Sequence, residues 1–302
     1  MKIALVIVHY ASQEDTFALL DSLQKTTLPK GVKTQVYIVD NSCSDTFQSD
    51  LQDQYPQVEL VVSPSNLGFA GGNNLGLQQA LRDKHDYYVL LNDDTLVNKD
   101  FFKSISKSAI TDKKVGLVGG LIYFAPGYEF KKKYKKTDRG KVIWYAGGRI
   151  DWSNVYCSHR GVDQVDRGQF KKVEQTDFVT GCLFITKRQV LEKVGLLNDD
   201  YFLYLEDVDF NIRVRQVGYQ TVFDPSIKIW HKVAQSSGIG SSLNDYFITR
   251  NRLVFGFKYT SFRTKFALLR EALHKLSSGT PAQKTAVKDF FSNNLGKGSW
   301  LK

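Results

Sequence analysis

The sequence predicts an α/β fold with a mostly parallel central sheet, a mixed sheet edge and additional helices at the C-terminus. In the first hundred residues, short apolar runs typical of buried strands alternate with amphipathic runs typical of helices, and this alternation indicates a parallel sheet. Beyond about residue 231 the strand pattern stops and the chain looks helical. With 302 residues, 42% of them hydrophobic, the chain can bury a substantial core.

The elements of the first half are predicted in chain order. Four nearly continuous apolar runs are expected to be strands, at residues 3–8, 35–39, 58–62 and 87–91. A helix is expected after Ser12, because residues 12–15 resemble a capping box and Phe17, Leu20 and Leu23 form an apolar stripe. Another helix is expected at about residues 73–82.

The second half gives weaker signals and is expected to contain long functional loops. A short helix is predicted at residues 101–108, and strands at 115–124, near 147–150 and within 178–186. Helices at 187–194 and 206–217 are each followed by a glycine, Gly195 or Gly218, as helix ends commonly are. The chain should be helical to about Leu276, and residues 297–302 are expected to form a frayed tail.

Composition restricts the function less than the fold. The net charge of +10 is compatible with nucleic acid, an anionic membrane or phosphorylated substrates. The densest basic cluster, residues 131–141, is either a solvated loop or a lid or clamp for an acceptor phosphate.

The three cysteines, Cys43, Cys157 and Cys182, have neither paired nor metal-type spacing, so we expect a reducing compartment, no disulfide and no zinc. No apolar run approaches the roughly 20 residues of a membrane span, and residues 2–8 do not resemble a signal peptide, which predicts a cytoplasmic chain.

Acidic residues stand where two predicted strands end. Asp93 and Asp94 follow the strand at 87–91, and burying unpaired carboxylates is costly, so a cation is expected there. In an open α/β sheet this position suits a divalent ion that carries phosphate oxygens, although a polar turn is the alternative. Asp40, after the strand at 35–39, would bind a base or ribose, or else form an Asx turn.

A glycine-rich segment at residues 65–76 opens the helix after the third strand. Gly68, Gly71 and Gly72 would allow close approach of a nucleotide to the backbone and to the helix start. The segment is neither a Walker loop nor a dinucleotide fingerprint. Because the first turn, after His9, lacks glycines, a nicotinamide or flavin enzyme and a nucleotidyltransferase are both disfavoured.

The order of these motifs resembles family 2 glycosyltransferases of the GT-A fold, specifically their bacterial rhamnosyltransferase-like branch. The motifs that carry the resemblance are Val-Asp-Asn-Ser-Cys-Ser-Asp at 39–45, Asn-Leu-Gly-Phe-Ala-Gly-Gly-Asn-Asn at 66–74, Leu-Asn-Asp-Asp-Thr at 91–95, and residues 180–188, 201–213, 230–231 and 246–252. The resemblance implies a catalytic domain over residues 1–258, with a nucleotide-binding half at about 1–110 and an acceptor half at about 111–258. Residues 259–302 would be a C-terminal helical extension.

The resemblance also implies a site for a nucleotide sugar and for Mg²⁺ or Mn²⁺. Asp94 and His231 would bind the metal, and because Asn92 takes the place of a further acid, the donor's phosphates would hold much of the ion. Asp207 would be the catalytic base in a pair with Glu206, with Glu206 and Asp209 as rivals and ordinary helix-start acids as the structural alternative. Donor contacts are expected from His9, Tyr10, Asp40, Asn66, Gly68, Gly71, Asn73, Asp93 and Arg250, the last with a solvated helix face as the alternative. Acceptor contacts are expected from Trp144, Thr180 and Gly181.

The implied reaction is inverting and metal-dependent transfer of L-rhamnose from dTDP-L-rhamnose to a hydroxyl of a cell-surface polysaccharide or lipid-linked oligosaccharide. A UDP-hexose or UDP-galactofuranose donor is one alternative, and a non-catalytic module that binds nucleotide sugars or glycans is another. Nucleic acid is not an expected partner. In residues 260–276, Phe262, Phe266, Leu269 and Leu273 form an apolar side with basic residues opposite, which would lie on the inner face of the membrane, pack onto the catalytic domain or form a dimer contact.

Overall fold

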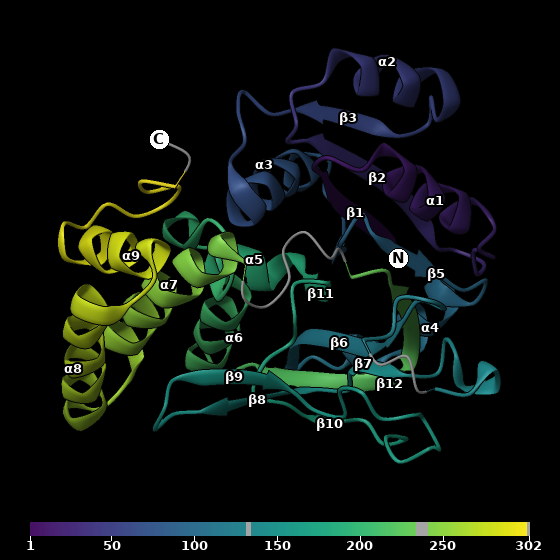
Figure 1. Cartoon of the computed structure of the whole chain (residues 1–302). Helices are drawn as coiled ribbons and strands as arrows, with labels where there is room; N and C mark the ends of the chain where they lie inside the picture. The colour runs from purple at the N-terminus through teal and green to yellow at the C-terminus, as the bar shows by residue number, and fades with distance from the viewer. Residues whose placement is uncertain (131–133, 234–240, 301–302) are drawn as a thin grey trace.

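The computed structural model describes residues 1–130, 134–233 and 241–300. In this part of the chain a ten-stranded mixed sheet has the strand order β10-β12-β6-β11-β4-β1-β2-β3, with β5 added beside β12 and β7 beside β6 (Figure 1). The expected lid lies partly outside the described residues, because residues 131–133 do.

The first half forms the parallel part of the sheet, as predicted. Its strands are β1 (Lys2–His9), β2 (Lys33–Asp40), β3 (Glu59–Val62) and β4 (Tyr87–Leu91), and all pair in parallel. Its helices are α1 (Gln13–Gln24), α2 (Asp45–Gln54) and α3 (Gly68–Arg82). The Ser12 side chain accepts a hydrogen bond from the Asp15 amide, which confirms the predicted cap of α1.

Helix α3 begins at Gly68, five residues before the predicted start, so most of the glycine-rich segment is helical. A Cβ atom on Gly72 would lie 2.9 Å from Cγ1 of Val8, and one on Gly76 would lie 2.5 Å from Cγ1 of Val6. These two glycines therefore allow α3 to pack closely on β1, and a contact of Gly72 with a nucleotide stays a prediction.

The second half forms the mixed edge of the sheet, as predicted. The described strands are β5 (Thr95–Val97), β6 (Val115–Phe124), β7 (Ile143–Tyr145), β8 (Gly148–Asp151), β9 (Tyr156–His159), β10 (Glu174–Gln175), β11 (Leu183–Lys187) and β12 (Gln220–His231). The helices between them are α4 (Phe101–Lys107), α5 (Arg188–Val194) and α6 (Glu206–Gln216). Strand β11 runs antiparallel between β4 and β6, β12 runs parallel to β6, and β8 and β9 form a separate hairpin.

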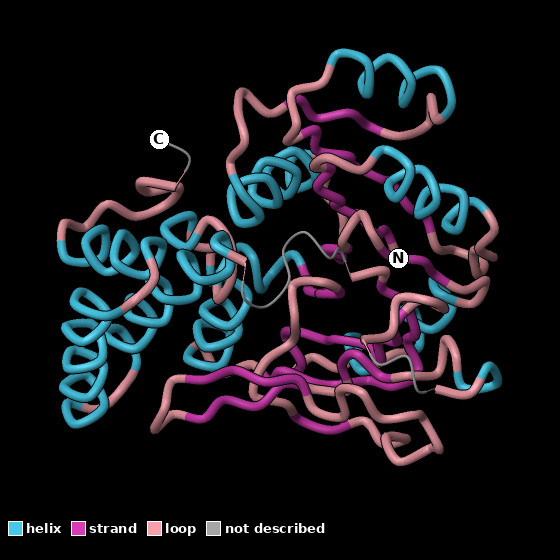
Figure 2. The backbone as a smooth tube through the Cα atoms, in the orientation of Figure 1, coloured by secondary structure: helices cyan, strands magenta, loops and turns pink. Residues whose placement is uncertain are grey.

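Three helices follow at the C-terminus: α7 (Ser242–Tyr259), α8 (Phe262–Ser278) and α9 (Pro281–Phe291). They group beside α6, at the opposite end of the molecule from β5 and α4 (Figures 1 and 2). The prediction of a frayed tail is wrong up to residue 300. The Trp300 ring lies 5.6 Å from that of Tyr246, and the Ser299 amide donates to Asp289 Oδ2 at 2.7 Å. Leu301 and Lys302 lie outside the described residues.

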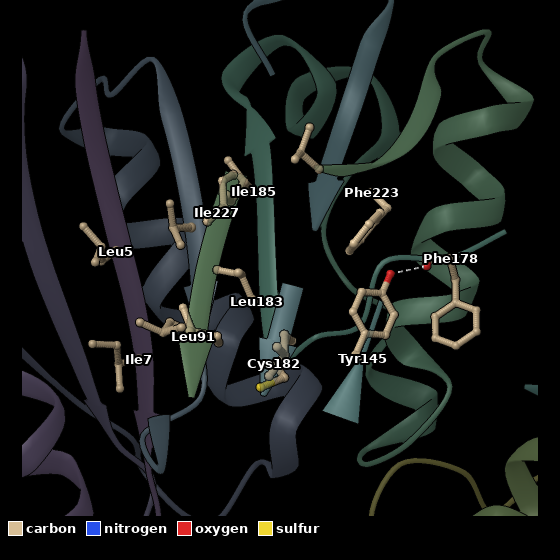
Figure 3. Packing of buried hydrophobic residues seen from close by; sticks show 14 of the residues in the cluster. Leu5, Ile7, Leu91, Tyr145, Phe178, Cys182, Leu183, Ile185, Phe223 and Ile227 are labelled. Atoms are coloured by element: carbon tan, nitrogen blue, oxygen red, sulfur yellow. Dashed lines mark hydrogen bonds between the residues drawn. The ribbon is translucent and has the colours of Figure 1, made fainter. Parts of the chain in front are cut away.

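The core lies on both faces of the sheet, because neighbouring residues of a strand point to opposite sides. On β1, Ile3, Leu5 and Ile7 join one hydrophobic cluster with α1, α2 and α4, whereas Ala4 and Val6 join another with α3 and α5. The first cluster continues to Tyr145, whose hydroxyl donates to the Phe178 carbonyl at 2.7 Å (Figure 3). Among the described residues, no helix combines the length and the apolarity that crossing a bilayer requires.

Candidate active site

The ends of β1 and β4 bring His9, Tyr10 and Asp93 together. Asp93 Oδ2 accepts a hydrogen bond from the Tyr10 amide at 3.3 Å and lies 3.8 Å from His9 Nδ1. Burial, opposed by the charge of Asp40, lowers the pKa of His9 to about 4, so the ring is neutral near pH 7. Burial and the neighbouring Asp94 raise the pKa of Asp93 to about 7. The Tyr10 side chain is exposed and accessible to a ligand.

Asp94 and His231 meet because β12 pairs with β5, which places His231 opposite Thr95. His231 Nε2 lies 3.0 Å from Asp94 Oδ1. The Trp144 ring meets the His231 ring edge-on, with centroids 4.5 Å apart. Burial lowers the pKa of His231, but Cys182 and Asp94 outweigh it and raise the pKa well above its ordinary value. Two residues predicted as metal ligands and one predicted for the acceptor are thus neighbours.

Asp207 lies in the first turn of α6. Its Oδ2 accepts a hydrogen bond from the Gly181 amide at 2.8 Å, which joins the predicted base to a residue predicted for the acceptor. Burial raises the pKa of Asp207, although the Gly181 and Val208 amides oppose the shift. Burial and the charge of Asp207 raise the pKa of Glu206 well above its ordinary value. Burial and the neighbouring charge thus disfavour the ionised form of Glu206, whereas two backbone amides favour the ionised form of Asp207.

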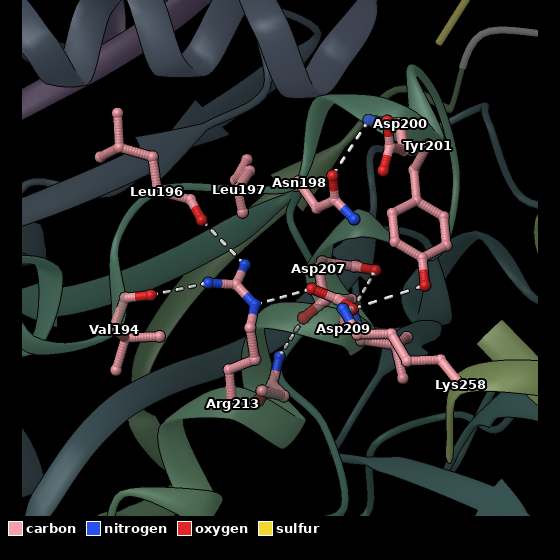
Figure 4. A network of polar contacts seen from close by, with 12 residues as sticks. Val194, Leu196, Leu197, Asn198, Asp200, Tyr201, Asp207, Asp209, Arg213 and Lys258 are labelled. Atoms are coloured by element: carbon pink, nitrogen blue, oxygen red, sulfur yellow. Dashed lines mark hydrogen bonds and ion pairs between the residues drawn. The ribbon is translucent and has the colours of Figure 1, made fainter. Parts of the chain in front are cut away.

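Asp209, the other rival for the base, is committed to a structural network (Figure 4). It is fully buried, it pairs with Arg213 at 2.7 Å and Lys258 at 2.8 Å, and it accepts a hydrogen bond from the Tyr259 hydroxyl at 2.7 Å. A carboxylate that is buried and already paired in this way is not accessible to an acceptor hydroxyl. Its role is to tie α6 to the end of α7.

The loop before α6 has an unusual backbone. Phe202, Tyr204 and Leu205 have φ angles of 61°, 70° and 72°, in a region that costs non-glycine residues of the order of 1–3 kcal/mol each. Asn251 of α7 stabilises this loop, because its Nδ2 donates to the carbonyls of Tyr201, Leu203 and Tyr204 at 2.9, 2.7 and 2.9 Å. Sequence reasoning missed this role, although Asn251 stands inside the motif at 246–252.

Arg250 was predicted to contact the donor, or else to be solvated, and the structure places it in neither position. Its side chain is fully buried, and its Nη2 donates to the carbonyls of Asp200 and Tyr201 at 3.2 and 3.1 Å. Its Nε donates to Asn251 Oδ1 at 3.0 Å, which orients that amide. Since a fully buried guanidinium cannot reach a ligand, Arg250 is corrected to a structural residue.

The start of α3 is held by side chains from two of the predicted motifs. Asn66 Oδ1 accepts from the Gly68 amide at 2.9 Å, and Asn41 bonds to both Asn66 and the Gly68 carbonyl. A Cβ atom on Gly68 would lie 2.4 Å from the Phe202 carbonyl oxygen. Gly68 therefore lets the glycine-rich segment contact the loop that precedes Glu206 and Asp207. Asn41 is a second residue that sequence reasoning missed.

Two other predicted donor residues lie inside α3. Asn73 is buried and its Nδ2 donates to the Phe69 carbonyl at 2.9 Å, while a Cβ atom on Gly71 would lie 2.8 Å from Cβ of Leu67. Both residues shape the first turns of the helix. A direct contact from either to a donor stays a prediction.

The segment at 179–181 completes the wall beside Asp207. Asn211 of α6 accepts from the Val179 amide and donates to the Val179 carbonyl, both at 2.9 Å. Thr180 is buried, and a Cβ atom on Gly181 would lie 2.8 Å from the Phe69 ring. Gly181 thus allows Phe69, from the glycine-rich segment, to approach Asp207. Asn211 is a third missed residue.

Asp40 forms the Asx turn that was the alternative to a nucleotide contact. Its carboxylate is fully buried and accepts hydrogen bonds from the Ser42, Cys43 and Ser44 amides, the Ser42 hydroxyl and the Gln48 amide group. Burial would raise the pKa of Asp40, but the bonds from Ser42, Gln48 and Ser44 lower it. The role of Asp40 in this structure is to shape the turn between β2 and α2.

In the described residues, no three His, Cys, Asp or Glu side chains are arranged to hold a metal by themselves. Asp94 and His231 supply two donor atoms, so a bound ion would need further ligands from its substrate. The arrangement combines Asp94 and His231, whose side chains meet, with the half-buried carboxylate of Asp207, which accepts a hydrogen bond from Gly181.

The sequence was compared with protein families and known proteins. The family model described as glycosyltransferase like family 2 matches residues 2–256. The chain is 24% identical over 216 residues to the N-acetylglucosaminyl-diphospho-decaprenol L-rhamnosyltransferase of Mycobacterium tuberculosis, which covers 67% of this chain and 68% of the relative. It is also 24% identical over 266 residues to the low-salt glycan biosynthesis hexosyltransferase Agl10 of Haloferax volcanii, which covers 83% of this chain and 74% of the relative.

Solved structures show the same fold at low identity. The chain matches GalNAc-T7, solved with UDP, GalNAc and Mn²⁺, with a TM-score of 0.60 and 15% identity, over 96% of this chain and 57% of that one. It matches the mannosyltransferase PcManGT of Pyrobaculum calidifontis, solved with GDP-Man and Mn²⁺, with a TM-score of 0.54 and 16% identity, over 96% and 74%. The match of a family model over most of the chain and the likeness of fold agree with the geometry of the site: the chain belongs to the family 2 glycosyltransferases and has the GT-A fold.

Proposed function

We propose that this glycosyltransferase moves a sugar from a nucleoside diphosphate donor to an acceptor hydroxyl with inversion, and that Asp207 is the catalytic base. The observation that carries the proposal is the surroundings of Asp207, whose carboxylate accepts a hydrogen bond from the Gly181 amide, whereas Asp209 is already paired with Arg213 and Lys258. A hydroxyl is a poor nucleophile until its proton is being removed, so a carboxylate at this position meets the chemical requirement. A single displacement needs no covalent intermediate.

Asp94 and His231 fit a divalent cation. Their donor atoms are 3.0 Å apart, and two ligands that bind one ion at right angles at about 2.1 Å are separated by about the same distance. Mg²⁺ and Mn²⁺ are both compatible with one carboxylate and one imidazole when phosphate oxygens complete the coordination. When bound, the ion would neutralise the charge of the diphosphate leaving group. Asp93, beside Asp94, would face the donor together with His9 and Tyr10.

The finer identity of the substrates is supported by the names of relatives. An L-rhamnosyltransferase from M. tuberculosis and a dTDP-rhamnosyl transferase, RfbF, from Shigella flexneri favour dTDP-L-rhamnose as the donor. A galactofuranosyltransferase from M. tuberculosis, GlfT2, keeps a galactofuranose donor as the alternative. We propose a cell-surface polysaccharide or a lipid-linked oligosaccharide as the acceptor.

The proposed activity is tested by incubating the protein with Mn²⁺, a panel of sugar nucleotides and candidate acceptors. Release of nucleoside diphosphate that depends on the acceptor is expected. If donor binding is measurable while no pair of donor and acceptor gives release, the rival function, a non-catalytic binding module, is favoured.

The metal is tested separately with Asp94→Ala. Replacing one of two protein ligands should weaken donor binding in Mn²⁺ by roughly tenfold, which is about 1.4 kcal/mol. In a chelator the variant and the wild type should bind the donor equally. Calorimetric titration measures both, and equal affinities in Mn²⁺ would remove Asp94 from the metal site.

Helix α8 supports a contact with an anionic membrane. Phe262, Phe266 and Leu273 are 83%, 56% and 54% exposed, whereas the opposite side of α8 buries Leu268 and Ala272. Three of the four residues of the predicted apolar side are thus exposed and the fourth, Leu269, is half-buried, which favours the alternatives to packing onto the catalytic domain. We propose an anionic bilayer as its partner because nearby basic residues, Arg263 and Arg270, complement lipid headgroups.

A further inference from the structure

A cavity of about 820 Å³ lies between the end of α1, strands β5, β6 and β12, and residues 139–141. Five cationic side chains from separate parts of the chain line it: Lys25, Lys99, Arg139, Lys141 and Lys228. Among the described residues, none of its lining side chains is acidic. The basic loop that the sequence analysis singled out therefore supplies two cations to a cavity whose other cations come from elsewhere in the chain.

The acidic residues near this basic cavity are engaged with other groups. Asp138 pairs with Arg167 at 2.9 Å, and Asp166 accepts a hydrogen bond from the Tyr123 hydroxyl at 2.5 Å. Glu129 accepts hydrogen bonds from the amides of Gly127 and Gly140. In the described part of the chain, no ion pair joins any of the five lining cations to a carboxylate. Gathering like charges around one cavity is unfavourable, and an anionic ligand would remove the repulsion.

The basic cavity is distinct from the candidate active site. Leu96 and Trp230 line it, while their chain neighbours Thr95 and His231 form the register pair beside Asp94. Because consecutive residues of a strand point to opposite faces, the Trp230 side chain in the cavity points away from the face of β12 that carries His231. The two sites nevertheless share this pair of strands.

Aromatic rings provide the apolar part of the basic cavity. Tyr123 and Trp230 have ring centroids 6.1 Å apart, and Trp230 Nε1 donates to the Gly140 carbonyl at 2.8 Å. This bond fixes residue 140, and with it the neighbouring Arg139 and Lys141, against β12. Apolar rings with a small number of placed charges are typical of a ligand site, and the volume is within the usual range of such sites.

We propose that the basic cavity is a second ligand site that binds a phosphate-bearing saccharide. The phosphate is assigned from the five cations alone. The saccharide rests on the proposed function, since a glycosyltransferase must hold a sugar acceptor, and an acceptor that carries a phosphate or diphosphate would use the charges on this face. Such a ligand binds without metal, which separates it from the donor.

The test is equilibrium binding in a chelator with charge-reversed protein. Lys25→Glu/Lys99→Glu changes two exposed side chains of the cavity, and Lys113→Glu/Lys114→Glu changes two exposed lysines outside it by the same charge. Calorimetry is done with inorganic pyrophosphate and with a soluble alkyl diphosphate sugar. The wild type and the outside variant are expected to bind both probes, the sugar-bearing probe more tightly, and the cavity variant at least tenfold more weakly.

Equal affinity of the cavity and outside variants for pyrophosphate would overturn the proposal. Another outcome is that the cavity variant binds both probes more weakly than the outside variant, as expected, while pyrophosphate and the sugar-bearing probe bind the wild type with equal affinity. That result would support the phosphate site and overturn the saccharide assignment. Because no turnover is measured, failure of the proposed transfer reaction would leave this result unaffected. Donor binding in Mn²⁺ should be the same in all three proteins, which shows that each is folded.

Discussion

Asp207 and Asp209 lie two positions apart on α6, yet their surroundings give them different roles. Asp209 pairs with Arg213 and Lys258 in a buried network, whereas Asp207 accepts a bond from a backbone amide beside Phe69 and Gly181. Its ion pairs give Asp209 a structural role. Asp207 is held in place without a cationic partner among its described contacts and can take up a proton.

Replacement of Asp207 tests this difference. Asp207→Asn should lower kcat by about 10²- to 10⁴-fold, the usual contribution of a general base, and leave donor binding nearly intact. Steady-state kinetics and calorimetry measure the two effects. Retention of full turnover would assign the base to another group.

The activity of the wild type should also depend on pH in a defined direction. Only the deprotonated form of Asp207 can accept a proton, and burial raises its pKa above the ordinary value of 3.8. The value of kcat/KM should therefore fall as pH decreases through this raised pKa, with an inflection above about pH 4. A profile of kcat/KM against pH checks this, and an inflection below that value would contradict the assignment.

At the scale of elements, α7 stabilises the loop that precedes Glu206 and Asp207. Three residues of this loop have positive φ angles, and the Asn251 amide bonds to three of its carbonyls. Those bonds offset part of the strain and fix where α6 begins. If Asp207 is the base as proposed, Asn251 is a positioning residue that acts through it.

Asn251→Ala should lower kcat at least tenfold with little change in the KM of the donor, because the base is displaced while the strand ends that face the donor are untouched. Loss of its bonds should also destabilise the fold by about 1–3 kcal/mol. Leu268→Ala is the control, since Leu268 is buried between α8 and α7 and its loss costs about 2–5 kcal/mol. Equal loss of kcat in both variants, measured where both are folded, would mean that Asn251 contributes only stability.

Helix α8 makes a prediction about membrane binding. Phe262→Ser/Phe266→Ser removes the most exposed rings of α8 and should reduce sedimentation with phosphatidylglycerol vesicles several-fold, while phosphatidylcholine vesicles should bind both proteins weakly. Donor binding should not change. If vesicle binding is unaltered and the wild type sediments as a dimer that the variant does not form, the apolar side is a dimer contact.

At the scale of the whole molecule, the candidate site is assembled from segments that are distant in sequence. The ends of β1 and β4, the start of α3, residues 179–181 and the start of α6 all contribute, and the C-terminal helices hold the last of these in place. Trp300 packs on Tyr246 and Phe247, in the cluster that also contains Phe202. The predicted division at residue 258 remains a proposal, although α8 and α9 share the main hydrophobic cluster with the sheet.

Ligand binding should therefore stabilise the whole protein. A donor present at 100 times its Kd adds about 2.7 kcal/mol of stability if it binds only the folded state. A thermal-shift panel of dTDP- and UDP-sugars should show a rise in Tm of a few degrees for the true donor with Mn²⁺ and a smaller rise with a chelator. A shift that is identical for every nucleotide sugar would show that the site does not select the sugar.

The sequence by itself determined the class of fold, the four strands of the parallel half and several of the residues that gather at the candidate site. Apolar runs indicate which segments are buried as strands. Acids or glycines at the end of a strand indicate turns where a ligand can bind. For this reason the strands that carry His9 and Asp93, and the position of Asp207 at the start of α6, could be predicted from the chain alone.

Only the tertiary structure decided which of these polar residues are free to act. The five hydrogen bonds to Asp40 come from residues within the turn and the helix that follow it. The burial of Arg250 and the pairing of Asp209 with Lys258 depend on partners 49 positions away, and the outward-facing rings of α8 depend on which face of the helix meets the core. The physical reason is that a residue's type gives the charge and hydrogen bonds that it can offer, whereas packing decides which of these are already used.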